Sequence, residues 1–162
     1  MLYNRDKAVA YAHEWVFRRN PRYYDFDKLG VGDCTNFISQ CLYAGCGVMN
    51  YTPTMGWYYI SLNQRAPAWS GVPFLYNFLT TNKGAGPYGQ EMSLENAMLG
   101  DVIQLSPDGM RFVHSLLIVA LGDPPSVDNI LITCHTKDSD NRPLNSYTYN
   151  RMRLIHIIDA RM

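Results

Sequence analysis

The sequence lacks a bias toward either charge. Its 14 Lys and Arg residues balance 14 Asp and Glu residues, and only 17% of the chain is charged. No basic stripe marks a nucleic-acid surface, and no apolar run is long enough to cross a membrane. The N-terminal segment also lacks the apolar stretch of a signal peptide. These absences predict a globular protein without a nucleic-acid partner, which is either cytoplasmic or a fragment of an exported protein.

Several motifs that carry enzyme chemistry are missing as well. The four cysteines contain no CxxC pair, which argues against a structural zinc site. No GxSxG motif provides a serine nucleophile, and the HxE and PCxxC elements of zinc deaminases are absent. The glycine-rich segment 83–89 lacks the Lys-Ser/Thr ending of a phosphate-binding loop. We therefore expect chemistry that needs no metal or cofactor.

The most informative stretch is GVGDCTNFISQCLYAG, residues 30–45, which has the pattern of a buried helix. Asp33 is a good N-cap residue, and Gly45 is a suitable C-terminal stop. Two glycines before the cap allow a sharp turn. Apolar side chains then recur at helical spacing, at Cys34, Phe37, Ile38, Cys41 and Leu42. Cys34 would lie on the first turn, where the amide dipoles favour the nucleophilic thiolate.

An alternative interpretation is that Cys34 is a small buried core residue, as most free cysteines are. A suitably placed histidine would favour catalysis. His114 opens one predicted strand and His135 closes the next. If these strands form a hairpin centred on its turn, the two imidazoles are cross-strand neighbours. His114 could then act as a base toward the thiol, while His135, or else Thr136 or Asp138 just after it, orients His114.

The rest of the chain predicts an α+β fold. Asn4 is expected to cap a first helix that ends near Pro21. Strands are expected at 101–105, 112–121, 129–135 and 153–159, joined by segments rich in turn-forming residues. This order predicts two helices packed on an antiparallel sheet. The length of 162 residues suits a single domain, 1–162.

Residues 46–92 are expected to be a loop-rich aromatic insertion that contains one short helix. They are rich in Gly, Pro, Tyr, Trp and Asn. Trp57, Tyr58 and Trp69 could pack beneath the loop or form a groove wall that recognises substrate, because long loops in compact domains are often functional. The predicted substrate-contacting residues are these three together with Asp33.

The motifs together resemble the family of putative amidase domains, within the papain-like superfamily of NlpC-type and CHAP peptidases. The resemblance rests on YNRDKAVAYAHEW, GDCTNFISQCLYAG, GDVIQL, FVHSLLIV, and CHTKD followed by Pro143-Leu144. It implies a papain-like core with the nucleophile Cys34, the base His114 and the third polar residue His135. It also implies a tyrosine about ten residues before the cysteine, here Tyr24 or else Tyr23.

The resulting prediction is a cysteine amidase or peptidase that forms a thioester acyl-enzyme on a peptide-containing substrate such as peptidoglycan. Two alternatives use the same residues differently. An acyltransferase or thioesterase could use the same Cys–His pair, and a non-catalytic module could bind glycan or peptide through the aromatic segment.

Overall fold

The computed structural model describes residues 1–162 as a mixed α+β fold with four helices and antiparallel sheets. The helices are α1 (Arg5–Trp15), α2 (Cys34–Cys46), α3 (Pro67–Ser70) and α4 (Val72–Thr81). The strands are β1 (Tyr59–Ser61), β2 (Gln64–Arg65), β3 (Gly86–Met92), β4 (Val102–Ser106), β5 (His114–Ala120), β6 (Leu131–Cys134), β7 (Ser139–Pro143) and β8 (Arg151–Arg161). No helix is long and apolar enough to span a membrane.

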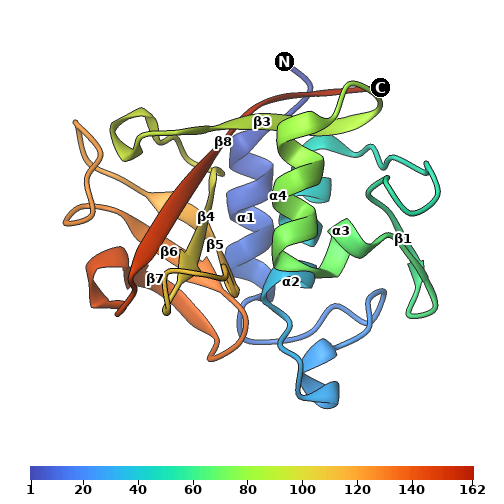
Figure 1. Ribbon diagram of the computed structural model, residues 1–162, viewed down its shortest axis with the longest axis horizontal. Coiled ribbons are helices and arrows are strands. Elements are labelled where there is room, and N and C mark those ends of the chain that lie inside the picture. The colour runs from blue at the N-terminus through green and yellow to red at the C-terminus, as the bar shows by residue number, and fades with distance from the viewer.

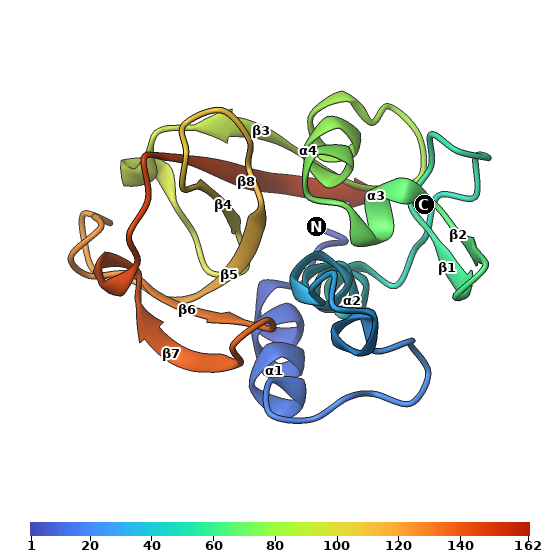
Figure 2. The same ribbon diagram turned by 60° about the horizontal axis from the view of Figure 1, so that its bottom comes forward.

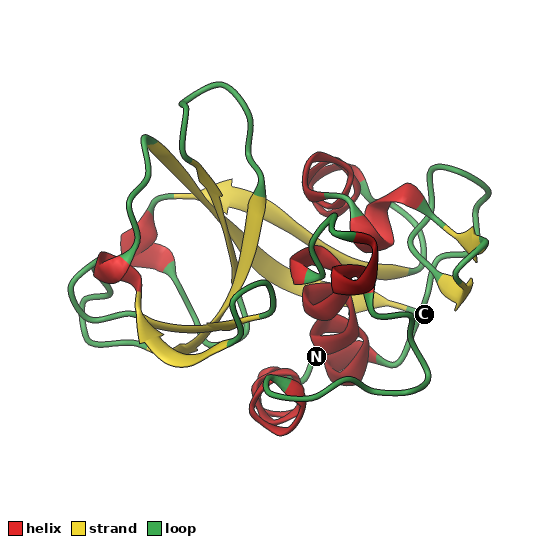
Figure 3. Cartoon of the chain, turned by 90° about the horizontal axis from the view of Figure 1, so that it is seen from below, coloured by secondary structure: helices red, strands yellow, loops and turns green.

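Six strands form the main sheet in the order β3-β8-β4-β5-β6-β7, and every neighbouring pair is antiparallel. β4 to β7 follow one another as a meander, whereas β8 returns to lie between β3 and β4 (Figure 1). The sheet curls strongly, so that the strands gather on one side of the molecule and the helices on the other (Figure 3). α1 and α2 lie against β5 and β6 (Figure 2).

The first helix follows the prediction closely at its start. The side chain of Asn4 accepts a hydrogen bond from the Lys7 amide at 3.0 Å, which satisfies one free donor of the first turn. Ala8, Ala12 and Val16 are fully buried, as the helical spacing predicts. The helix ends at Trp15 and not near Pro21, because the chain turns there toward the site described below.

The sheet separates two hydrophobic cores. The larger core lies between the helices and one face of the sheet, and the smaller core lies inside the curl on the other face. Alternate residues of β5 therefore enter different cores: Leu117 packs beneath the helices, and Leu116 and Ile118 pack inside the curl.

The segment 46–92 is more regular than predicted. It contains α3, α4, β3 and the short β1–β2 hairpin. Trp57 and Trp69 are both fully buried, with ring centroids 4.7 Å apart, so both pack in the core beneath this segment. Tyr58 is partly exposed and packs against the edge of the larger core.

Both buried indoles are tied to α2 by hydrogen bonds. Trp57 Nε1 donates to Ser39 Oγ and Trp69 Nε1 donates to Asn36 Oδ1, each at 2.9 Å. A buried indole needs such a partner, since an unpaired N–H is costly to bury. The aromatic segment thereby helps to fix the helix that begins at Cys34.

We predict that Trp69→Phe destabilises the protein by about 2 kcal/mol, because it leaves Asn36 Oδ1 without its donor and opens a small cavity. The matched control is Trp15→Phe, since this indole nitrogen makes no hydrogen bond within the chain and the residue is only partly buried. Urea denaturation of both variants measures the difference. Equal stability losses would contradict the role assigned to the Asn36 contact.

Candidate active site

α2 begins at Cys34, immediately after a tight turn. Gly30 and Gly32 both have positive φ, of 72° and 85°, which glycine adopts without strain. Space is also short at Gly32, where an added Cβ would lie 3.2 Å from Thr136 Oγ1. The helix runs to Cys46 and is closed by Gly47 in the left-handed conformation, two residues beyond the predicted stop at Gly45.

The sulfur of Cys34 is almost entirely enclosed, with 7% of the residue exposed. Its side-chain partner is the Thr35 hydroxyl, at 3.7 Å from Sγ to Oγ1. Burial raises the pKa of the Cys34 thiol, although the Ser115 amide and the Thr35 hydroxyl and amide act in the opposite direction. The expected thiolate is therefore not the resting form at neutral pH, because the cost of burying an anion outweighs these donors.

His114 is the first residue of β5. The next residue is Ser115, whose amide faces the Cys34 sulfur. Its ring packs near Tyr147, with centroids 5.9 Å apart, on the side of the sheet that faces the smaller core. The imidazole makes no side-chain hydrogen bond, and none joins it to Cys34. Burial, with help from the positive charge of Arg142, lowers the pKa of His114 to about 4. At neutral pH His114 is a neutral imidazole.

The prediction that His135 lies opposite His114 was wrong by one residue. The ladder between β5 and β6 pairs Leu117 with Thr133 and Ile118 with Ile132, and its continuation places Ser115 opposite His135. The register shifts between Ile118 and Ala120, and a shift of one residue turns a side chain to the other face. His135 consequently faces α2 and stacks on Phe37 at 3.8 Å.

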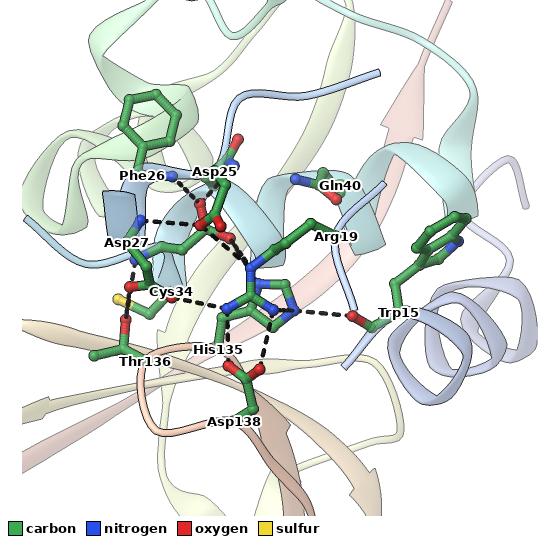
Figure 4. A network of polar contacts seen from close by, with 12 residues as sticks. Trp15, Arg19, Asp25, Phe26, Asp27, Cys34, Gln40, His135, Thr136 and Asp138 are labelled. Carbon is green, nitrogen blue, oxygen red and sulfur yellow. Dashed lines mark hydrogen bonds and ion pairs between the residues drawn. The ribbon is translucent and has the colours of Figure 1, made fainter. Parts of the chain in front are cut away.

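His135 instead forms a buried pair with Asp33. His135 Nδ1 lies 2.6 Å from Asp33 Oδ2, and Nε2 lies 3.0 Å from the carbonyl oxygen of Trp15 (Figure 4). Nε2 also lies 3.2 Å from Arg19 Nη1, which can only donate, so this side of the imidazole contacts both an acceptor and a donor. The pair joins the start of α2, the end of β6 and the end of α1.

The carboxylate of Asp33 is fully engaged and does not cap α2 as predicted. Its Oδ1 accepts from the Phe26 amide at 2.9 Å and from Asn36 Nδ2 at 2.8 Å. No side chain therefore caps the first turn of α2. Only 1% of Asp33 is exposed, so its side chain is enclosed within this network.

Arg19 is a neighbour of the candidate site that sequence reasoning missed. Its guanidinium contacts the carboxylates of Asp25, Asp27 and Asp138, with the last held by two hydrogen bonds of 3.0 Å (Figure 4). Asp138, the alternative third residue, is thus committed to Arg19. The signal in the sequence was the aspartates that flank the predicted site, Asp25 and Asp27 before it and Asp138 after it, together with upstream arginines that had no assigned role.

Tyr24 lies beside the first turn of α2. Its carbonyl accepts from Asn36 Nδ2 at 3.0 Å, and its amide donates to the Tyr59 hydroxyl at 2.8 Å. The ring meets Phe26 edge-on and the phenol makes no hydrogen bond within the chain. Tyr23, the alternative, is buried and stacks on Trp69, which leaves Tyr24 as the more exposed tyrosine of the two.

A hollow of about 480 Å³ opens on the surface beside this tyrosine. Its lining combines aromatic rings with cationic side chains, and consists of Arg19, Asn20, Pro21, Arg22, Tyr23, Tyr24, Asp25, Lys28 and Tyr59. No group of three His, Cys, Asp or Glu side chains is arranged to hold a metal ion.

We predict that removing either member of the Asp33–His135 pair costs about 1–3 kcal/mol, since the polar group that remains is then buried without this hydrogen-bond partner. A double-mutant cycle with Asp33→Ala and His135→Ala, followed by urea denaturation, measures the coupling. The exposed Glu14–Arg18 pair is the matched control, where Glu14→Ala should cost less than about 0.5 kcal/mol. Additive losses at Asp33 and His135 would contradict the pairing.

Comparison with known proteins places this chain in a family. The model of the family described as "Putative amidase domain" matches residues 2–158. The uncharacterized protein YhbB of Bacillus subtilis (strain 168) is 34% identical over 156 residues, which is 93% of this chain and 43% of that protein. The chain thus spans less than half the length of this relative. No solved structure matches. The chain belongs to the family of putative amidase domains.

Proposed function

We propose that the protein hydrolyses an amide bond through a thioester formed on Cys34. The observation that carries this proposal is the position of the sulfur. It lies on the first residue of α2 and faces the amide of Ser115, directly after His114. Membership of an amidase family supports the reaction class. No metal or cofactor takes part in the proposed steps.

The uncapped first turn of α2 suits the attack on a carbonyl. In this proposal Cys34 Sγ bonds to the carbonyl carbon, and negative charge develops on the oxygen. Since Asp33 is turned toward His135, no side-chain oxygen caps the first turn. The Cys34 amide donates to the oxyanion, with the Tyr24 hydroxyl as a second donor. Each such donor is worth about 3 kcal/mol in known cases.

His114 serves as the base and then as the acid. Its ring turns from Tyr147 toward the sulfur, accepts the thiol proton and later gives it to the leaving amine. The neutral imidazole favoured by burial is the form that accepts a proton. Water then attacks the thioester with the same histidine as base, which regenerates the thiol. His135 orients the first turn of α2 through Asp33.

The proposed substrate is a peptide amide of the kind found in peptidoglycan. The hollow beside Tyr24 supports this choice, because Arg22 and Lys28 would attract carboxylates and the tyrosines would pack against the peptide. In this proposal residues 1–162 form one papain-like domain, to which 46–92 adds the buried aromatic segment. Partly exposed Tyr58 remains a proposed substrate contact.

We predict that Cys34→Ala abolishes amide hydrolysis and that His114→Ala slows it by about 10²–10⁴-fold, the range for loss of a general acid–base group. The measurement is amine release from a panel of peptide amides that includes a peptidoglycan stem peptide. Cys46→Ala and His13→Ala are matched controls at residues outside the site, and both should retain activity.

Two outcomes separate the alternative functions. If an added amine acceptor captures the acyl group in place of water, the protein is an acyltransferase. If the unmodified protein binds the stem peptide but releases no amine from any substrate in the panel, it is a binding module and the hydrolase proposal fails.

We predict that kcat/KM falls on acidification only near pH 4. His114 must be neutral to accept the thiol proton, and its pKa is lowered to about 4, so activity is lost as pH falls through that value. Arg142→Gln should move this limb to higher pH, because the positive charge of Arg142 disfavours the imidazolium. Arg111→Gln, at an exposed arginine, is the control. A limb near 6.5 in the unmodified protein would contradict the assignment.

A further inference from the structure

A line of hydrogen bonds leads from the Cys34 sulfur across the sheet, away from the Asp33–His135 pair. Cys34 Sγ lies 3.7 Å from Thr35 Oγ1, which lies 2.9 Å from Ser115 Oγ. Gln104 Nε2 donates to Ser115 Oγ at 3.2 Å. Arg153 in turn donates to Gln104 Oε1 through Nε at 3.0 Å and Nη2 at 2.6 Å. The line thus connects α2, β5, β4 and β8.

The direction of these hydrogen bonds is fixed at the arginine. A guanidinium has only donors, so the atom of Gln104 that faces Arg153 must be the oxygen. The amide nitrogen of Gln104 then points the other way, where it also donates to the carbonyl of Val72 at 2.9 Å. The partners of both the oxygen and the nitrogen of the Gln104 amide are thus consistent with this orientation.

The orientation of Gln104 determines which hydroxyl donates to which. Because Ser115 Oγ accepts from Gln104, its own proton is free to be donated to Thr35 Oγ1. Thr35 then accepts that bond and directs its proton at the sulfur. Thr35 is 1% exposed, and Ser115 and Gln104 are fully buried, so bulk water does not replace any of these donors.

We propose that Gln104 and Arg153 are positioning residues that set this chain of donors, so that Thr35 presents an O–H group to the Cys34 sulfur and stabilises its thiolate. The inference rests on the proposed function, in which the thiolate forms when His114 takes the proton. A hydrogen bond to a charged group is stronger than one to a neutral group. The donor therefore favours the thiolate over the thiol.

The Arg153 end of this series of hydrogen bonds is held by further contacts. The Arg153 guanidinium lies 3.6 Å from the ring centre of Tyr76 and 3.9 Å from that of Phe112, and the Tyr76 hydroxyl donates to Glu91 at 2.8 Å. These contacts keep Arg153 aimed at Gln104.

Other titratable groups near the sulfur act against the thiolate or are neutral. The carboxylate of Asp33 disfavours a second negative charge next to it. Cys134 on β6 does so only when it is ionised, and burial raises the pKa of its thiol to about 11. His114 on β5 is neutral at pH 7. The Thr35 hydroxyl is therefore the side-chain donor that favours the thiolate in this group.

The test measures the pH dependence of Cys34 alkylation by iodoacetamide, mapped by mass spectrometry. Thr35→Val removes the final donor while keeping the shape of the side chain. Gln104→Glu keeps an oxygen toward Arg153 but removes the donor to Ser115, so that the serine donates to the new carboxylate and the chain reverses. We expect each variant to raise the alkylation pKa of Cys34 by about one unit, which is about a tenfold loss of thiolate.

The controls are buried hydroxyls outside the chain. Ser106→Ala removes a hydroxyl on the same strand as Gln104 that bonds only to Asp108, and Thr133→Val removes one on β6 that bonds to Asp140. Both should leave the alkylation profile unchanged. Thr35→Val keeps the test decisive if the charge introduced at Gln104 prevents folding.

The outcomes separate this inference from the proposed function. If Cys34→Ala abolishes amide hydrolysis but Thr35→Val and Gln104→Glu alkylate like the controls, the donor chain is overturned and the amidase stands. If the alkylation pKa shifts as expected but no amide is cleaved, the donor chain stands and the proposed function fails.

Discussion

The buried pair of Asp33 and His135 is the contact on which the geometry of the site depends. It joins three segments that are distant in the sequence, because the carboxylate belongs to the turn before α2, the imidazole to the end of β6, and the second acceptor to the end of α1. Burying polar side chains is expensive unless each is hydrogen-bonded. Here the Phe26 amide and the Asn36 side chain donate to the other carboxylate oxygen of Asp33. Because Cys34 is the next residue, these contacts also hold it in position.

The same pair has a chemical consequence at the helix terminus. A carboxylate at the N-cap normally occupies the free amides of the first turn. His135 draws the Asp33 carboxylate away, and the first turn of α2 is left without a side-chain cap. The stability given up at the helix end is offset by the buried pair, and the amide donors stay available to an oxygen that becomes negative during a reaction. The contact that anchors the start of α2 thus also leaves its first turn without a side-chain cap, as the proposed catalysis requires.

The sequence predicts the α+β class, the first helix, the helix that begins at Cys34 and four of the main strands, since each has a clear hydrophobic period or cap. It does not predict β3 or β7. The polar sequence SDNRP predicts a turn where the structure has β7. This segment forms a strand because it pairs with the edge of β6. β3 lies in a glycine-rich segment that owes its structure to pairing with β8.

The candidate site shows the same limit at the level of single residues. Cys34 and His114 stand out by local pattern, but the partner of His135 depends on a one-residue shift in the hairpin, which spacing alone does not reveal. The protonation states also could not be predicted. The helix position favours a thiolate, whereas burial, a property of the completed fold, favours the thiol. Arg19 was missed because its partners come from separate segments.

The place of β8 in the sheet constrains how the chain can be made. β8 is the last strand along the sequence, yet it lies between β3 and β4, and Asp159 accepts hydrogen bonds from the amides of Leu2 and Tyr3. During synthesis the meander of β4 to β7 can form first, but β3 lacks its partner and β4 keeps one free edge until residues 151–161 leave the ribosome. An exposed strand edge invites pairing with other chains. The nascent chain is therefore most prone to aggregate in the interval before β8 has been made.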